Sequence, residues 1–370
     1  MMPIRRYFTI ILGLLCMLIS TPLRAEGQVP TGIRPLDTPA LPAKTPAQDT
    51  LIAITKAGNR LVAVGEHGII IYSDDNGATW KQARVPVSVL LTAVAFANPM
   101  QGWAVGHYGV ILHTSDGGVT WQLQLNGVQA NQLTLDDANQ VMAQDPNSPA
   151  SQMALRRANI FMAAGADKPF LTILVQNAND AIAFGGYRLA MKTTDGGKTW
   201  TDWSLHVGDP LSHNLYDVRT IGPYIVIAGE AGHVFVSTDG GNTFPAATSP
   251  TDATMFGAIA TGDANNGILV FGVAGQAYRS EDGGKTWKTV QAFAPEANLL
   301  AARTLSSGVI VIVNEAGVIY LSNNHGRSFT RMPQPQKMSL FDLVQAPNGN
   351  IVFVGNLGVQ IMPLQDLSAN

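Results

Sequence analysis

Short apolar runs separated by glycine-rich polar turns recur along almost the whole chain. One part shows the pattern well: residues 91–97, 102–105, 110–114 and 120–125 form four such runs, rich in Val, Leu, Thr and Trp. Runs of this length, bounded by Gly, Asn and Asp, predict β-strands joined by tight turns. Together they predict one four-stranded unit, with residues 91–97 innermost and 120–125 outermost.

This unit is repeated. Its landmark is GHYGVILHTSDGGVTW, from Gly106 to Trp121, and in six copies an aromatic residue lies 15 positions after the first Gly or the Asn that replaces it. A seventh copy stops before its aromatic. The anchors of the seven copies are Gly65, Gly106, Gly185, Gly229, Gly272, Asn314 and Gly355.

Successive anchors lie 41 to 44 residues apart, except for one interval of 79 between the second and third. A period of this size matches one four-stranded propeller blade of about 40–50 residues. The sequence therefore predicts an all-β fold, a seven-bladed β-propeller over residues 51–364. The long interval places an insertion between blades 2 and 3.

The insertion, residues 127–168, has the periodicity of helices. Leu135, Ala138 and Met142 form one apolar stripe, and Ala154 and Phe161 belong to another that follows Pro149 at a helix start. We expect two short helices over or beside the mouth of the central channel. Such an addition is either an inert cover or a partner-binding element, and we favour the second because loops on a rigid scaffold commonly carry function.

Charge excludes one class of partner. Only 13% of residues are charged and the net charge is −3. Nucleic-acid binding usually needs a clustered basic face, which this composition does not offer.

The N-terminus predicts export. Arg5 and Arg6 precede an apolar run that ends at Ile19, and the small residue Ala25 follows, which is typical of a signal peptide over residues 1–25. We expect a periplasmic or otherwise exported chain with no transmembrane span after cleavage. Cys16, the one cysteine, lies within a weak likeness to a lipoprotein box, but the apolar residues after it favour ordinary cleavage. The mature chain then has no thiol.

Residues 26–50 hold five prolines, which cannot continue a helix or a central strand. Two interpretations remain open. The segment is either a flexible linker or part of it closes blade 7, which lacks an aromatic outer strand of its own.

Five of the six complete copies carry a turn of the form S/T-x-D-x-G-x-T followed by Trp or Phe. Its Asp accepts backbone N–H groups and its glycines tolerate positive φ, so we interpret it as structural. Five carboxylates in five separate blades cannot meet on one substrate or one calcium ion. These structural residues are Asp75 and Trp80, Asp116 and Trp121, Asp195 and Trp200, Asp239 and Phe244, and Asp282 and Trp287, with Asn324 in the sixth copy.

This turn is similar to the Asp-box, or BNR, repeat of sialidase-like propellers. The longer form, VGxxGxIxxTxDGGxTW, resembles the photosystem II stability and assembly factor family, which implies a seven-bladed propeller of the thylakoid lumen or periplasm. Relatives in non-photosynthetic bacteria are linked to transport systems of the resistance-nodulation-division type. The resemblance implies an assembly or accessory role, and the long insertion departs from the pattern.

Variable residues fall in the second-to-third strand turn of each blade, which has the form GxxG and lies on the same face as the insertion. We expect these turns near the channel and treat them as the partner-binding candidates. They are Glu66, His67, His107, Tyr108, Tyr187, Arg188, Glu230, Glu315 and Asn356.

Three alternatives involve a site in the ring. A sialidase-like glycoside hydrolase would need Arg188 and an inner-strand arginine, Arg219 or Arg303, to converge with a Tyr–Glu pair. A zinc site would use His67 and His107 beside Glu66. A sugar-binding module would need an aromatic-lined channel. We expect no catalysis, metal or cofactor, and a monomeric scaffold that presents the loops and the insertion to an envelope or membrane protein complex.

Overall fold

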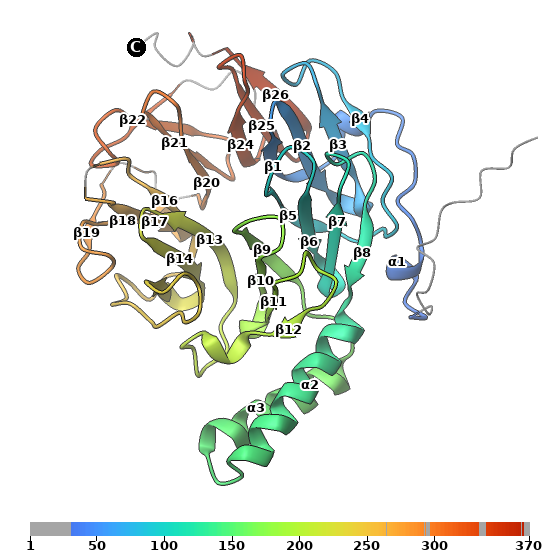
Figure 1. The fold of residues 1–370 in the computed structure, drawn as a ribbon. Helices are drawn as coiled ribbons and strands as arrows, with labels where there is room; N and C mark the ends of the chain where they lie inside the picture. The colour runs from blue at the N-terminus through green and yellow to red at the C-terminus, as the bar shows by residue number, and fades with distance from the viewer. Residues whose placement is uncertain are drawn as a thin grey trace, which may run out of the picture.

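The computed structural model describes residues 31–365 except 264, 292, 294–296, 333–337 and 364. The predicted signal peptide lies outside the described residues. Seven antiparallel sheets stand around a central axis, each running outward from its innermost strand in chain order (Figure 1). This arrangement confirms the predicted seven-bladed, all-β propeller.

Blades 1 to 3 each have four strands. Their bounds are β1 (Leu51–Ala57), β2 (Arg60–Gly65), β3 (Ile70–Ser73), β4 (Lys81–Gln82), β5 (Leu91–Phe96), β6 (Gly102–Gly106), β7 (Val110–Thr114), β8 (Gln122–Leu125), β9 (Phe170–Val175), β10 (Ala181–Gly185), β11 (Ala190–Thr193) and β12 (Thr201–Asp202).

Blades 4 and 7 have three strands in the described residues, and blades 5 and 6 have four. Their bounds are β13 (Leu215–Ile221), β14 (Tyr224–Gly229), β15 (Val234–Ser237), β16 (Met255–Ala260), β17 (Ile268–Gly272), β18 (Ala277–Ser280), β19 (Lys288–Thr289), β20 (Leu299–Thr304), β21 (Ile310–Asn314), β22 (Ile319–Ser322), β23 (Thr330–Arg331), β24 (Leu340–Gln345), β25 (Ile351–Gly355) and β26 (Gly358–Met362).

The core lies between blades rather than inside one of them. Seven apolar clusters each combine side chains from two neighbouring blades, including one that joins blade 7 to blade 1. A sheet packed on both faces needs apolar residues on both sides, which explains why every residue of β6, β10 and β25 is buried. The continuous apolar runs of the sequence therefore correspond to the second strand of each blade.

Residues 31–50, the described part of the proline-rich segment, add no fourth strand to blade 7. Residues 31–50 form α1 (Arg34–Asp37) and the 3-10 turn η1 (Pro46–Gln48), with coil between them. The coil runs antiparallel to residues 82–88 of blade 1, where the Ser88 N–H donates to the Pro35 carbonyl at 2.9 Å and the Ala40 N–H to that of Val85 at 3.1 Å. At its end, η1 packs against β26 of blade 7.

The insertion forms a helical hairpin of α2 (Gly127–Gln144) and α3 (Pro149–Ala164), as its periodicity predicts. Asn126 and Gln129 form a capping box that starts α2, and Pro149 occupies the first turn of α3. The hairpin extends outward from the rim of the ring (Figure 1). The sequence predicts the hairpin over or beside the channel mouth; the structure does not place it over the mouth, because its base packs on β12 and on the turn after β6.

Among the described residues, none of the helices combines the length and the apolar character needed to span a bilayer.

Candidate functional site

In the Asp-box turns, the recurring side chains form hydrogen bonds within the turn itself. Asp116 accepts hydrogen bonds from the Thr114 hydroxyl at 2.8 Å, the Thr120 N–H at 2.9 Å and the Thr120 hydroxyl at 2.6 Å. The boxes around Asp75, Asp195, Asp239 and Asp282 repeat this pattern. A carboxylate whose acceptor sites are used in this way holds its own turn and has little capacity left for a ligand.

These hydrogen bonds also fix the charge of the boxes. Bonds from the threonine four positions later lower the pKa of Asp75, Asp195 and Asp282 to about 2 and lower the pKa of Asp239 as well. The carboxyls are therefore ionised throughout the physiological range and are unsuited to general acid–base work at neutral pH.

The aromatic residue that ends each box lies between blades. Trp121 donates from its indole nitrogen to the Gly118 carbonyl at 3.1 Å, and its ring packs with Val62 of blade 1 and Leu123 of blade 2. Trp80 makes the equivalent bond to the Gly77 carbonyl at 2.8 Å. The aromatics thus contribute to the interfaces that join neighbouring blades.

The GxxG turns are built by backbone. A Cβ on Gly106 would lie 2.2 Å from the Leu90 carbonyl oxygen, so the first glycine is required for close approach rather than for an unusual φ. The same carbonyl accepts the N–H of His107 at 2.9 Å. The residue at the apex is left-handed in blades 1 to 5: His67, Tyr108, Tyr187, Ala231 and Ala274 have φ of 52–57°.

Left-handed geometry is costly for residues with side chains, and its persistence at His67, Tyr108 and Tyr187 places their rings at the apexes of three adjacent turns. Glu66, His67, His107 and Tyr187 are exposed, whereas Tyr108 is half-buried. Partial desolvation of the His107 ring by the surrounding turn lowers its pKa, so the imidazole is neutral at neutral pH.

Three other candidates are tied to their own blades. Glu230 accepts the Asn214 N–H at 3.1 Å, Glu315 accepts the N–H and the amide of Asn298, and Asn356 accepts the Ser339 N–H at 2.9 Å. Each bond fastens the turn to the residue that precedes the blade's innermost strand. A structural role therefore competes with partner binding at these positions.

Arg188 is the candidate that the structure places elsewhere. Its side chain is buried, and it donates to the Asp209 carbonyl beside Arg157 of α3. Burial, together with the charge of Arg157, lowers the pKa of Arg188 to about 10. Arg188 is therefore a buried support between blade 3 and the hairpin, not an exposed contact for a partner.

The base of the hairpin contains residues that the sequence pattern did not single out. Thr134 of α2 donates to Asp202 of β12 at 2.6 Å, and Arg157 lies 3.9 Å from the same carboxylate. Asn131 donates to the carbonyls of Phe161 and Gly165, which locks α2 to the end of α3. Their polar residue types gave no signal, because an isolated helix pattern cannot tell a buried polar position from a solvated one.

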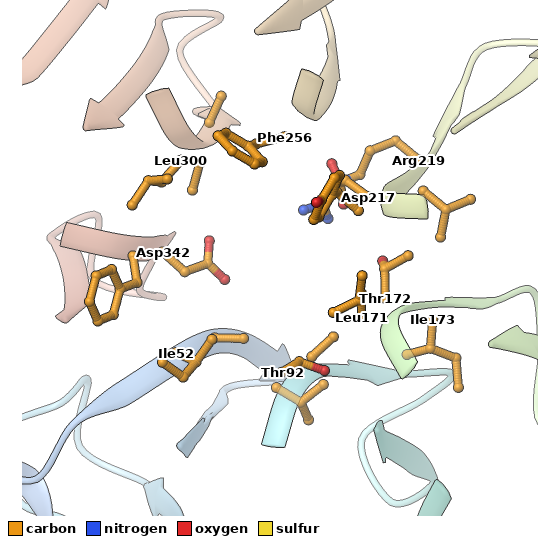
Figure 2. A pocket seen from close by; sticks show the side chains of 18 of the residues that line it. Ile52, Thr92, Leu171, Thr172, Ile173, Asp217, Arg219, Phe256, Leu300 and Asp342 are labelled. Carbon is orange, nitrogen blue, oxygen red and sulfur yellow. The ribbon is translucent and has the colours of Figure 1, made fainter. Parts of the chain in front are cut away.

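The central channel has a volume of about 360 Å³ and is lined mainly by the innermost strands (Figure 2). Ion pairs lie within it: Arg303 is 2.7 Å from Asp342, and Arg219 is 3.0 Å from Asp217. Both carboxylates also accept backbone N–H groups, from Ile54 of blade 1 and Ala258 of blade 5. No described residue of the GxxG turns is in this lining, but in blades 1 to 5 each turn packs against the innermost strand of the following blade.

The arrangement separates the groups that a sialidase-like site needs. Arg219 and Arg303 face the channel, whereas Arg188 is buried beside the hairpin and Tyr187 is exposed on the loop face. Across the residues that the structure describes, no group of three His, Cys, Asp or Glu side chains is arranged to hold a metal ion, and this includes the neighbourhood of His67 and His107.

Comparison with known proteins agrees with this architecture. The family model described as photosynthesis system II assembly factor YCF48 matches residues 74–141 and 160–291. The photosystem II assembly lipoprotein Ycf48 of Synechococcus sp. (strain CC9902) is 29% identical over 182 residues, which cover 48% of this chain and 53% of that protein. The chain spans about half the length, or less, of the curated relatives it matches.

Solved structures share the fold at low identity. A structure of YCF48 bound to a D1 peptide has a TM-score of 0.61 at 15% identity, covering 88% of this chain and 98% of that one. The GH74 enzyme of Niastella koreensis has a TM-score of 0.56 at 14% identity, covering 85% of this chain and 52% of that one. The family model matches more than half of the chain, and the protein belongs to the Ycf48 family of photosystem II assembly factor-like propellers.

Proposed function

We propose that this protein is an exported, non-catalytic scaffold that binds a protein segment and helps to assemble or support an envelope or membrane complex. The complex that we name is a transport system of the resistance-nodulation-division type. The contact surface comprises the outer face of α3 and the exposed turn residues of blades 1 to 3.

The observation that carries this proposal is an apolar stripe on α3 facing solvent. Met153 and Ile160, two turns apart on one side of α3, are 40% and 64% exposed, although the helix packs its other side. Tyr187, at the apex of its turn, is 54% exposed and its ring meets the edge of Phe161 at the end of α3. Exposed apolar side chains on adjacent elements are typical of a protein-binding surface.

The hairpin is held rigidly enough to present this stripe. The Asn131 bonds and the Thr134–Asp202 bond fix its base, and Phe161 is buried in the cluster between blades 2 and 3. A surface that is already ordered loses little conformational entropy on binding, which favours affinity.

A relative supports a protein segment as the ligand class. A structure of YCF48 contains a D1 peptide, and that protein shares its fold with this one. A family member that binds a peptide makes a protein partner a natural choice here, while the insertion gives this chain a contact surface of its own.

The test uses the affinity-tagged full chain expressed in its native host, with quantitative mass spectrometry of crosslinked envelope partners. The variant Met153→Glu/Ile160→Glu places two charges on the α3 stripe and should reduce recovery of the partner at least tenfold. The matched control Asn139→Glu/Gln140→Glu adds the same charge to the exposed polar side of α2 and should retain it.

Both variants change exposed positions, so their circular dichroism spectra and melting temperatures should match those of the parent. Undiminished recovery with Met153→Glu/Ile160→Glu would overturn the proposal. We prefer these substitutions to deletion of residues 128–167, because that deletion would also remove Phe161 and Arg157 from the packed base.

The glycoside hydrolase alternative lacks the convergence it requires, because Arg188 is remote from the channel arginines. Incubation of the full chain with a panel of sialylated and envelope glycans should give no turnover. Release of free sugar that is abolished by Arg219→Ala would favour the alternative instead.

A further inference from the structure

We infer that the rim between blades 1 and 2 holds a second binding site, a groove for an extended peptide that carries a carboxylate beside an apolar side chain. The inference goes beyond the proposed function, because this groove is formed by other elements than the hairpin. The α1 end of the proline-rich segment lies at the flank of the ring near β8 (Figure 1).

The groove is a cavity of about 410 Å³ with two walls and a floor. Pro39 and Pro42 of the N-terminal segment form one wall, and the start of β8 at Gln122 forms the other. The floor is apolar and buried: Ala83, Val85 and Trp121 are 6%, 5% and 4% exposed. A largely apolar concavity of this size is within the range of ligand-binding pockets.

Backbone hydrogen bonds hold the groove open in advance. The Ala40 N–H donates to Val85 at 3.1 Å, and the Gln82 side chain accepts from the Ala43 N–H and donates to the Leu41 carbonyl. On the other side, the Arg84 N–H donates to the Val119 carbonyl and the Trp121 N–H to that of Arg84, both at 3.0 Å. The proline rings restrict φ, so the first wall has little freedom to collapse into the cavity.

Arg84 supplies the charge of the site. Its backbone is used in the two bonds above, but its side chain is exposed and makes no ion pair or hydrogen bond with any described residue. Arg60, another long basic side chain of blade 1, differs in this respect, since it pairs with Asp74 at 2.6 Å. An arginine without a partner at the edge of an apolar groove is complementary to a carboxylate attached to an apolar body.

Both walls favour a peptide as the source of that carboxylate. Residues 39–42 and 120–122 run beside the cavity, and Leu41, 76% exposed, continues the apolar surface at its edge. An extended peptide places alternate side chains on one face, so one can enter the groove while a neighbouring acidic residue reaches Arg84.

The test selects random octapeptides displayed on phage against the immobilised mature chain and then measures a selected peptide by fluorescence polarisation. Enriched peptides should combine Asp or Glu with a nearby Leu, Ile or Phe. Arg84→Glu, which reverses the charge, and Gln122→Trp, which fills the groove from an exposed position, should each weaken binding at least tenfold.

Two controls test whether the peptide binds in the groove itself. Lys81→Glu makes the same charge change on β4 outside the lining and should alter binding less than twofold, as should the hairpin variant Met153→Glu/Ile160→Glu. The inference is overturned if no acidic–apolar peptides are enriched, if binding survives both groove variants, or if sodium dodecanoate binds in an Arg84-dependent way while peptides do not. Failure here leaves the hairpin proposal standing, and the reverse also holds.

Discussion

Two glycine-containing turns recur in every complete blade, and they differ in whether side chains or the backbone hold the turn in shape. In the Asp-box, side chains hold the turn: Asp116 is hydrogen-bonded to Thr114 and Thr120, and Trp121 packs between the blades. In the GxxG turn, the backbone holds the turn, because the His107 N–H donates to the Leu90 carbonyl. The side chain at the apex takes no part in this bond. A turn built by side chains must repeat them, whereas a turn built by backbone leaves side chains free to vary.

The comparison predicts its largest effect at the first glycine of a GxxG turn. Gly106→Ala should destabilise the protein by about 3 kcal/mol or more, because the new Cβ would meet the backbone oxygen of Leu90 at 2.2 Å. Gly240→Ala is the control: it has φ of +73° but open space, so left-handed strain alone should cost about 1 kcal/mol. Urea denaturation measures both, and equal losses would contradict a role for Gly106 in close approach.

A smaller effect is expected inside one Asp-box. Asp116→Ala removes four hydrogen bonds that hold a partly exposed turn and should cost about 1–2 kcal/mol. Glu66→Ala, on an exposed GxxG position of the neighbouring blade, should stay within about 0.5 kcal/mol. Urea denaturation again measures both, and if the two losses were the same, the side-chain and backbone turns would not differ as we describe.

Acid should distinguish the same two turns. The pKa of Asp75, Asp195 and Asp282 is about 2 in the folded protein, below the value near 3.9 of an unfolded aspartate. Their stabilising contribution is therefore complete above about pH 4 and is lost as the pH falls towards 2. Melting temperatures should decline over this window, and the triple variant Asp75→Asn/Asp195→Asn/Asp282→Asn should show a flatter decline.

The smallest effect is expected at the apex of a GxxG turn. Ala274→Gly relieves a left-handed alanine at φ 53° and should change stability by less than about 1 kcal/mol, in the stabilising direction. Tyr187→Gly relieves the same geometry and should leave the melting temperature nearly unchanged while weakening capture of the partner. A large loss of stability in either variant would show that the apex side chains are structural as well.

Repetition made the fold predictable from sequence. The spacing of Gly65, Gly106 and the other anchors fixed the number of blades, and the stripes around Leu135 and Phe161 identified both helices. The direction in which the helical hairpin extends was not predictable. It extends outward because Thr134 and Arg157 contact Asp202 on the rim, and this is a long-range contact between polar residues. Arg188 was misplaced for a related reason, since its burial depends on a hairpin that packs over it.

The groove between blades 1 and 2 was also beyond prediction. Its first wall comes from a proline-rich segment that the sequence assigned to blade 7 or to a linker, and nothing local shows that residues 35–43 pair with residues 82–88. Whether the Arg84 side chain has a partner depends on which segments of the chain lie beside it, and the repeat pattern of the sequence does not predict this.

Closure of the ring has a consequence for how the protein is made. Every described strand of blade 1 comes from the beginning of the chain and every described strand of blade 7 from its end, and the Ile54–Asp342 hydrogen bond joins residues 288 positions apart. While the chain emerges from the ribosome, the apolar face of blade 1 around Leu61 and Ile71 has no partner until the last blade is made. For most of its synthesis the protein is therefore an unclosed ring with exposed apolar surface. A chain truncated before residue 340 should aggregate rather than close as a smaller ring.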